Sequence, residues 1–132
     1  MILVDTSVLI DFLRGVVNTK TDQFESILQL DIPYGISAYT YQELLQGARN
    51  EKEYNTLHDY LGSLVIYYLD ANIHSFEKAS RLVFDLRRKG VTPRSTIDVY
   101  IALTAIENNL MLLHNDRDFD AMIDYIDELS NY

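Results

Sequence analysis

The stretch Ile2-Leu3-Val4-Asp5-Thr6-Ser7 decides the fold of this 132-residue chain. Three consecutive apolar residues followed directly by an acid are typical of a short strand that is buried on both faces. The segment from Thr6 to Arg14 has the apolar spacing of a helix and ends at Gly15. A strand, an acid and a helix in this order predict the opening of a parallel α/β sheet.

The same alternation continues along the chain. Further strands are expected at Gly35–Ser37, Val65–Leu69 and Met111–Leu113, and further helices at Asp22–Leu30, Thr40–Ala48, Glu51–Leu61, from Asn72 to Gly90, and from Ser95 or Thr96 onward. Strands separated by helices indicate parallel pairing with right-handed crossovers. We therefore expect an α/β three-layer sandwich with a central, mostly parallel sheet, formed by residues 1–132 as a single domain. The stretch Phe119–Tyr132 fits either a helix or an irregular acidic tail.

Composition excludes several classes of protein. The chain has 11 Lys and Arg, 20 Asp and Glu, a formal charge of −9 and no Cys, so disulfide scaffolds, thiolate zinc sites and cysteine catalysis are excluded. Its apolar runs are far shorter than the roughly 20 residues of a membrane span, and its first residues lack the features of a signal peptide. We expect a cytoplasmic protein without a membrane segment. The acidic excess by itself argues against a nucleic-acid partner.

The positions of four acids change that interpretation. Asp5 and Asp116 follow predicted strands, while Glu43 and Asp98 lie in the predicted first turns of helices. Strand ends and helix N-termini meet at one edge of a parallel sheet, so the four carboxylates are expected to converge. They would repel one another unless cations neutralise them. Oxygen ligands without thiolates favour a hard ion, Mg²⁺ or Mn²⁺.

Each acid also has a simpler structural explanation. Glu43 completes a capping box with Thr40, Asp98 can serve the helix dipole, and Asp116 can be a loop residue or an N-cap. Asp5 is the hardest to explain in this way, because a carboxylate directly after a buried strand is costly without a partner or an ion. Taken one at a time these explanations remain open, and the joint placement of the acids favours a metal site.

Four motifs in order resemble a known family. They are Val4-Asp5-Thr6-Ser7-Val8-Leu9-Ile10, the segment Ile36 to Gly47 around Glu43, Ile97-Asp98-Val99-Tyr100-Ile101-Ala102, and Leu112-Leu113-His114-Asn115-Asp116-Arg117-Asp118-Phe119. In order, spacing and total length the chain resembles the PIN-domain ribonucleases, and most closely the VapC-type toxins of bacterial toxin–antitoxin pairs. The resemblance covers nearly the whole chain.

The resemblance implies a function and a set of site residues. It implies a Mg²⁺-dependent (or Mn²⁺-dependent) endoribonuclease in which Asp5, Glu43, Asp98 and Asp116 are the catalytic and metal-binding acids. Ser7 matches the small polar residue that supports the first acid, and Asp118 matches a second acid of the last motif. It also implies an RNA substrate, a small antitoxin protein with a basic C-terminal segment, and a homodimer.

Two features depart from the family pattern. His114 stands where the family has Thr or Ser, and its imidazole either replaces the hydrogen bond of that hydroxyl, contacts a phosphate, or only fills space. The chain after Phe119 lacks the apolar run of a short closing strand, so such a strand is not expected from the sequence.

The basic residues offer one candidate contact for the substrate. Residues 81–94 hold five Lys or Arg and one acid, and Arg94 lies four residues before Asp98, so we predict that it binds a substrate phosphate. Helix C-termini also attract basic residues, which explains Arg87 and Arg88 without RNA.

Two other functions stay open. The first is a receiver module, which would need an acid pair after its first strand, where this chain has Thr6 and Ser7. The second is a catalytically silent PIN-like module.

Overall fold

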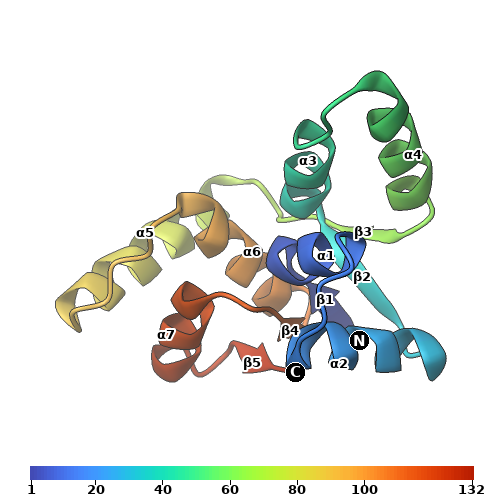
Figure 1. The fold of residues 1–132 in the computed structure, drawn as a ribbon. Helices are drawn as coiled ribbons and strands as arrows, with labels where there is room; N and C mark the ends of the chain where they lie inside the picture. The colour runs from blue at the N-terminus through green and yellow to red at the C-terminus, as the bar shows by residue number, and fades with distance from the viewer.

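The computed structural model describes residues 1–132 and contains one five-stranded sheet (Figure 1). Its strands are β1 (Ile2–Val4), β2 (Tyr34–Ser37), β3 (Val65–Tyr67), β4 (Met111–Leu113) and β5 (Ser130–Asn131), in the spatial order β3-β2-β1-β4-β5. All four strand pairs are parallel. β1 lies at the centre, where Ile2 pairs with both Tyr34 and Met111.

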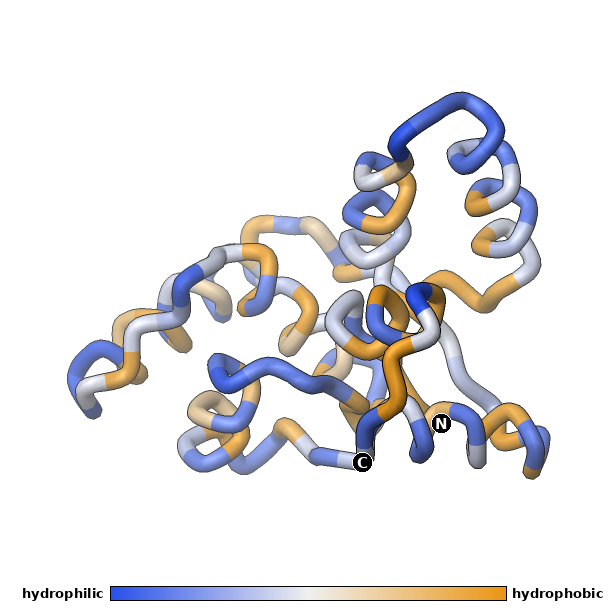
Figure 2. Tube along the Cα trace, in the orientation of Figure 1, coloured by the Kyte–Doolittle hydropathy of each residue, from blue (hydrophilic) through white to orange (hydrophobic).

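Helices connect the strands and cover the sheet. They are α1 (Thr6–Leu13), α2 (Thr19–Gln29), α3 (Ala38–Gln46), α4 (Glu51–Gly62), α5 (Ile73–Arg88), α6 (Thr96–Glu107) and α7 (Arg117–Tyr125). The α3–α4 hairpin projects from the sheet, and Figure 2 shows that the loop joining these two helices is hydrophilic. None of the helices is long and apolar enough to span a lipid bilayer.

Alternating side chains of β1 create two cores, one on each face of the sheet. Leu3 packs in a cluster with buried residues of α5, α6 and α7. Ile2 and Val4 point to the opposite face and pack in a second cluster with residues of α1, α2, α3 and α4. The whole of β1 is buried, because both faces of a parallel sheet are covered by helices. The predicted three-layer α/β architecture is therefore confirmed.

The end of the chain corrects one prediction. Residues after Phe119 continue α7 to Tyr125, and the chain then forms β5, which pairs with β4. This closing strand was not expected because its two residues, Ser130 and Asn131, are polar and exposed. Buried Ile126 and Leu129 hold the segment against the core instead. Because β5 is held by flanking residues and by backbone pairing, its own sequence contains no apolar run from which a strand could be predicted.

The start of α3 corrects a second prediction. Ser37, and not Thr40, is the N-cap residue, and its hydroxyl accepts a hydrogen bond from the Thr40 backbone N–H at 3.0 Å. Both residues can cap a helix, but the chain enters α3 directly from β2. Glu43 consequently lies in the second turn of α3 rather than in the first. The capping-box explanation of Glu43 is wrong, so its position needs another reason.

Candidate metal centre

The candidate site lies at the edge of the sheet where β1 and β4 end. Asp5 follows β1 directly and caps α1, while Asp116 caps α7 three residues after β4. Asp98 lies in the first turn of α6, which Ser95 caps. Glu43 reaches the same region from α3. It lies close enough for the charge of Asp5 to raise the pKa of Glu43, and for the charge of Glu43 to raise the pKa of Asp98.

Asp5 is buried and is held by Ser7. Asp5 is only 4% exposed, and its Oδ2 accepts hydrogen bonds from the Ser7 backbone N–H at 3.0 Å and from the Ser7 hydroxyl at 2.6 Å. Ser7 Oγ also accepts a hydrogen bond from the backbone N–H of Asn115. The serine therefore ties the end of β1 to the loop after β4. Burial raises the pKa of Asp5, an effect that the bonds from Ser7 oppose and the charge of Asp116 reinforces.

Glu43 is positioned by the hydroxyl of Thr6, a partner 37 positions away that its neighbours in the sequence do not predict. Thr6 Oγ1 donates a hydrogen bond to Glu43 Oε1 at 3.1 Å, and it lies 3.1 Å from Thr40 Oγ1. Both threonines are buried. Thr6 thus connects α1 to α3 and fixes the direction of the Glu43 carboxylate. Burial, followed by the charge of Asp5, raises the pKa of Glu43, and the bond from Thr6 opposes that rise.

Asp98 is crowded by the negative charges of the other acids. Its pKa is raised to about 7, first by burial and then by the negative charges of the other carboxylates, which are Asp5, Asp116, Asp118 and Glu43. None of the causes of this shift is a hydrogen bond or a cation. The structure therefore places Asp98 among four like charges, without a compensating partner of its own.

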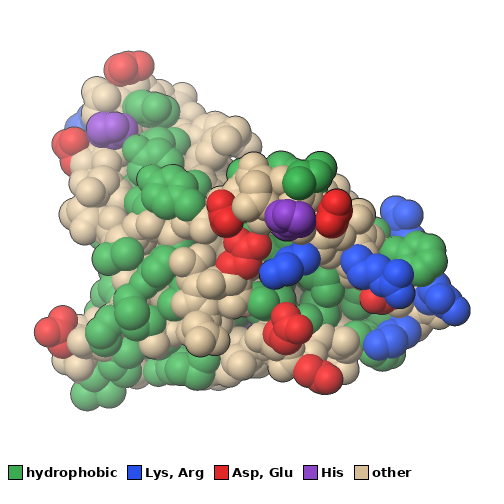
Figure 3. Space-filling view, turned by 180° about the vertical axis from the view of Figure 1, so that it is seen from behind, with side chains coloured by type: hydrophobic (Ala, Val, Ile, Leu, Met, Phe, Trp, Pro, Cys, Tyr) green, Lys and Arg blue, Asp and Glu red, His purple; other side chains and the backbone are tan.

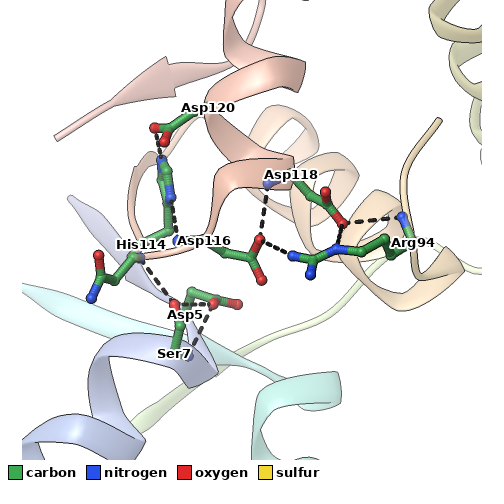
Figure 4. Close-up of polar contacts among 8 residues, drawn as sticks. Asp5, Ser7, Arg94, His114, Asp116, Asp118 and Asp120 are labelled. Carbon is green, nitrogen blue, oxygen red and sulfur yellow. Dashed lines mark hydrogen bonds and ion pairs between the residues drawn. The ribbon is translucent and has the colours of Figure 1, made fainter. Parts of the chain in front are cut away.

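Asp116 and Asp118 share the one arginine of the site. Asp116 Oδ1 accepts hydrogen bonds from the Asp118 backbone N–H at 2.9 Å and from Arg94 Nη2 at 3.0 Å. Asp118 Oδ2 accepts two more from Arg94, from its backbone N–H at 3.0 Å and from Nε at 3.1 Å. In Figure 4 the Asp116 carboxylate lies between Asp5 and the Arg94 guanidinium. The predicted proximity of Arg94 to the acids is thus present in the structure.

His114 is a buried support for the last acid. It is 1% exposed, its Nδ1 accepts a hydrogen bond from the Asp116 backbone N–H at 3.2 Å, and its ring packs against Phe119. Burial lowers the pKa of His114, so the neutral ring can accept this bond. Its Nε2 is buried without a hydrogen-bond partner and lies 3.6 Å from Asp120 Oδ1. Of the roles considered for His114, the structure contains the hydrogen bond and the packing.

Comparison with known proteins identifies the family. The sequence model of the PIN domain matches residues 2–124. The chain belongs to the PIN domain family. Ribonuclease VapC11 of Mycobacterium tuberculosis is 28% identical to it over 123 residues, which cover 92% of this chain and 91% of that protein. VapC ribonuclease Mb1587 of Mycobacterium bovis matches it equally. The family resemblance inferred from the four motifs is confirmed.

Solved structures share the fold of this PIN domain. VapBC2 from Rickettsia felis, bound to a DNA fragment from its promoter, has a TM-score of 0.75 at 20% identity, covering 100% of this chain and 98% of that one. VapBC-1 from nontypeable Haemophilus influenzae has a TM-score of 0.73 at 22% identity, covering 100% and 97%. At these identities the likeness concerns the fold, and it agrees with the parallel five-stranded sheet.

The donor atoms of this PIN domain fit a hard divalent cation. Its charged donors are carboxylates without any thiolate, and Asp98 has no cationic partner among the protein's own side chains. No group of three or more His, Asp or Glu side chains is already arranged around one point to hold an ion. Repulsion between carboxylates favours such separation. The site therefore has the chemistry of a Mg²⁺ or Mn²⁺ centre, although its side chains stand apart.

Proposed function

We propose that this protein is a metal-dependent endoribonuclease that cleaves RNA phosphodiester bonds and acts as the toxin of a toxin–antitoxin pair. The observation that carries the proposal is the crowding of the half-buried Asp98 by four other negative charges, which together with burial raise its pKa to about 7. Such an arrangement is costly for a fold unless it serves to bind a cation. The VapC relatives are ribonucleases by name, which supports RNA as the substrate.

The proposal gives each residue of the site a role. Asp5, Glu43, Asp98 and Asp116 would hold Mg²⁺ or Mn²⁺, which supplies charge for the developing oxyanions and acidifies a bound water. Ser7 orients Asp5, and His114 orients the turn that carries Asp116. Asp116 Oδ1 accepts hydrogen bonds from Arg94 and from the Asp118 backbone N–H, so Asp116 Oδ2 is the oxygen left to bind the cation.

The substrate needs a contact outside the carboxylates. Arg94 is 73% exposed, and its Nη1 is not engaged by either carboxylate that binds the rest of the side chain. This nitrogen is the best-placed donor for a phosphate oxygen of the RNA. Guanidinium groups suit phosphate because they are planar donors with a permanent charge.

The decisive experiment compares RNA cleavage by wild type and by Asp5→Asn. Total RNA is incubated with each protein in Mg²⁺ and in EDTA, and the cleavage sites are mapped by end sequencing. We expect specific sites only with wild type in Mg²⁺. Asp59→Asn is the matched control, because Asp59 is 89% exposed and lies in α4 rather than at the site. Full Mg²⁺-dependent cleavage by Asp5→Asn would refute the proposal, and a wild type that binds Mn²⁺ without cleaving would favour a silent PIN-like module.

A groove beside Glu43 suits the proposed antitoxin. It has a volume of about 580 Å³, and its apolar wall comes from α1, α3 and α4, through Ile10, Leu13, Leu44 and Leu57. Glu43 also lines it, so a segment lying in this groove with its apolar side down would bring a basic end to the carboxylates. Leu57→Asp should abolish binding of the antitoxin in calorimetry while leaving RNA cleavage intact. Unchanged affinity would exclude this groove as the binding site.

The surface of α5 suits the proposed homodimer. Ile73, Phe76 and Phe84 are exposed on this helix, and a hydrophobic groove of about 730 Å³ lies between α5 and α6. Lys and Arg side chains gather around an exposed hydrophobic group at one end of the face in Figure 3, and Arg81 and Arg88 lie over the Phe84 ring. Phe84→Asp should convert a dimer to a monomer in light scattering, and an unchanged mass would exclude this surface.

A further inference from the structure

Arg94 is the basic residue that forms ion pairs with the acid cluster. We define this cluster as Asp5, Glu43, Asp98, Asp116 and Asp118. It lies in the loop between α5 and α6 and forms ion pairs at 3.0 Å with Asp116 and at 3.1 Å with Asp118. No other Lys or Arg forms an ion pair with a member of the cluster. The remaining ion pairs made by Arg side chains join residues of the same helix, or of a helix and its flank. One positive charge thus faces five carboxylates.

Asp118 is committed to Arg94. Its Oδ2 accepts both the backbone N–H and the Nε–H of Arg94, and the Asp118 side chain is only 16% exposed. Two bonds from one residue to one oxygen fix the loop and aim the guanidinium at Asp116. Nη2 then reaches Asp116 Oδ1, which also accepts the Asp118 backbone N–H. Asp118 is therefore positioned to anchor Arg94, and the other oxygen of Asp116 is left for a different cation.

We propose that Arg94, anchored by Asp118, is a built-in counter-ion of the acid cluster that opposes metal binding and so sets the metal affinity of the site. The inference rests on the proposed metal site. A guanidinium and a divalent ion that share Asp116 repel each other, and both neutralise the same carboxylates. Arg94 should therefore stabilise the protein without metal and weaken its affinity for metal. A residue that only supports the ligands would instead strengthen both.

The test measures Mn²⁺ affinity by calorimetry and Tm with and without Mn²⁺, using the full chain. For Arg94→Gln we expect the Kd for Mn²⁺ to fall on the order of tenfold, which is a typical strength of coupling between two sites. We expect Tm in EDTA to fall by about 2 to 5 °C. In saturating Mn²⁺ the difference in Tm from wild type should shrink, because the ion then supplies the missing charge. Arg94→Lys, which keeps the charge, should stay close to wild type in Kd.

The matched control is Arg49→Gln. Arg49 is 86% exposed and ion-paired with Glu53 at the start of α4, so this variant loses the same charge from a surface position outside the cluster. Its Kd for Mn²⁺ should stay within twofold of wild type. Weaker or unchanged Mn²⁺ binding by Arg94→Gln, or equal tightening by Arg49→Gln, would overturn the inference. A wild type without saturable Mn²⁺ binding would overturn the proposed metal site and this inference with it, which distinguishes the two failures.

Discussion

Replacing Asp98 with Asn should stabilise the metal-free protein at pH 8. Asp98 has a pKa of about 7 in the folded protein, raised from 3.8 first by burial and then by the neighbouring carboxylates. A folded pKa above the unfolded one means that ionisation costs the folded state more than the unfolded state. The stability present below pH 4 is therefore lost progressively as the pH rises to about 7. Asn has nearly the same shape and cannot ionise, so the variant avoids this loss.

The structure sets the size of the effect. A shift of about three pKa units corresponds to about 4 kcal/mol of unfolding free energy. Asp98 is only partly buried, and solvent screening reduces such interactions, so we expect Asp98→Asn to gain about 1 to 2 kcal/mol at pH 8. For a chain of this length that gain corresponds to a Tm increase of about 3 to 8 °C.

Urea unfolding in EDTA at pH 5 and pH 8 measures the effect. The advantage of Asp98→Asn over wild type should grow between these two pH values, while Asp59→Asn, whose side chain is exposed, should show no such growth. Saturating Mn²⁺ at pH 8 should reverse the order, because wild type then binds the ion more tightly than the variant. An Asp98→Asn protein that is no more stable than wild type at pH 8 in EDTA would refute the reasoning.

Three further outcomes are expected. The raised pKa of Asp98 means that protons compete with metal below about pH 7. The Kd for Mn²⁺ in calorimetry should therefore rise by up to about tenfold per pH unit below pH 7, and equal Kd values at pH 8 and pH 6 would contradict this. Ser7→Ala removes the 2.6 Å bond to Asp5 and should lower the free energy of unfolding in urea by about 1 to 3 kcal/mol, so a loss below about 0.5 kcal/mol would contradict this role. Gly35→Ala would put a Cβ 2.5 Å from the Val65 carbonyl oxygen, and we expect about 1 to 3 kcal/mol of destabilisation, whereas an unchanged Tm would show that β2 and β3 can separate.

The sequence predicts the parts of the fold that depend on buried apolar runs. β1 and β4 have the predicted bounds, Ile2–Val4 and Met111–Leu113. Both faces of β1 are covered, so its sequence must be apolar throughout, and such a run is readable without any knowledge of its neighbours. The convergence of the acids follows from the same rule, because carboxyl ends of parallel strands share one edge.

Features that depend on distant partners could not be predicted. The bond from Thr6 to Glu43 joins residues 37 positions apart, and the bonds from Arg94 to Asp118 span 24 positions. The sequence predicts that Arg94 lies near the cluster, but it does not say which carboxylates take its donors. β5 belongs to the same class, since its place depends on backbone pairing with β4 and on the burial of Leu129.

Helix capping and metal binding are compatible uses of the same acids. Asp5 caps α1 through Oδ2, and Asp116 caps α7 through Oδ1, so each cap occupies one oxygen of a carboxylate that has two. Asp98 lies in the first turn of α6, where the helix dipole favours negative charge. Glu43 lies outside the first turn of its helix, so it has no helix N-terminus beside it, and the Thr6 hydroxyl donates a hydrogen bond to it instead. The structural explanations of the acids are therefore part of the functional one: helix N-termini and hydroxyls make a cluster of desolvated carboxylates tolerable, and they leave oxygens free for a cation.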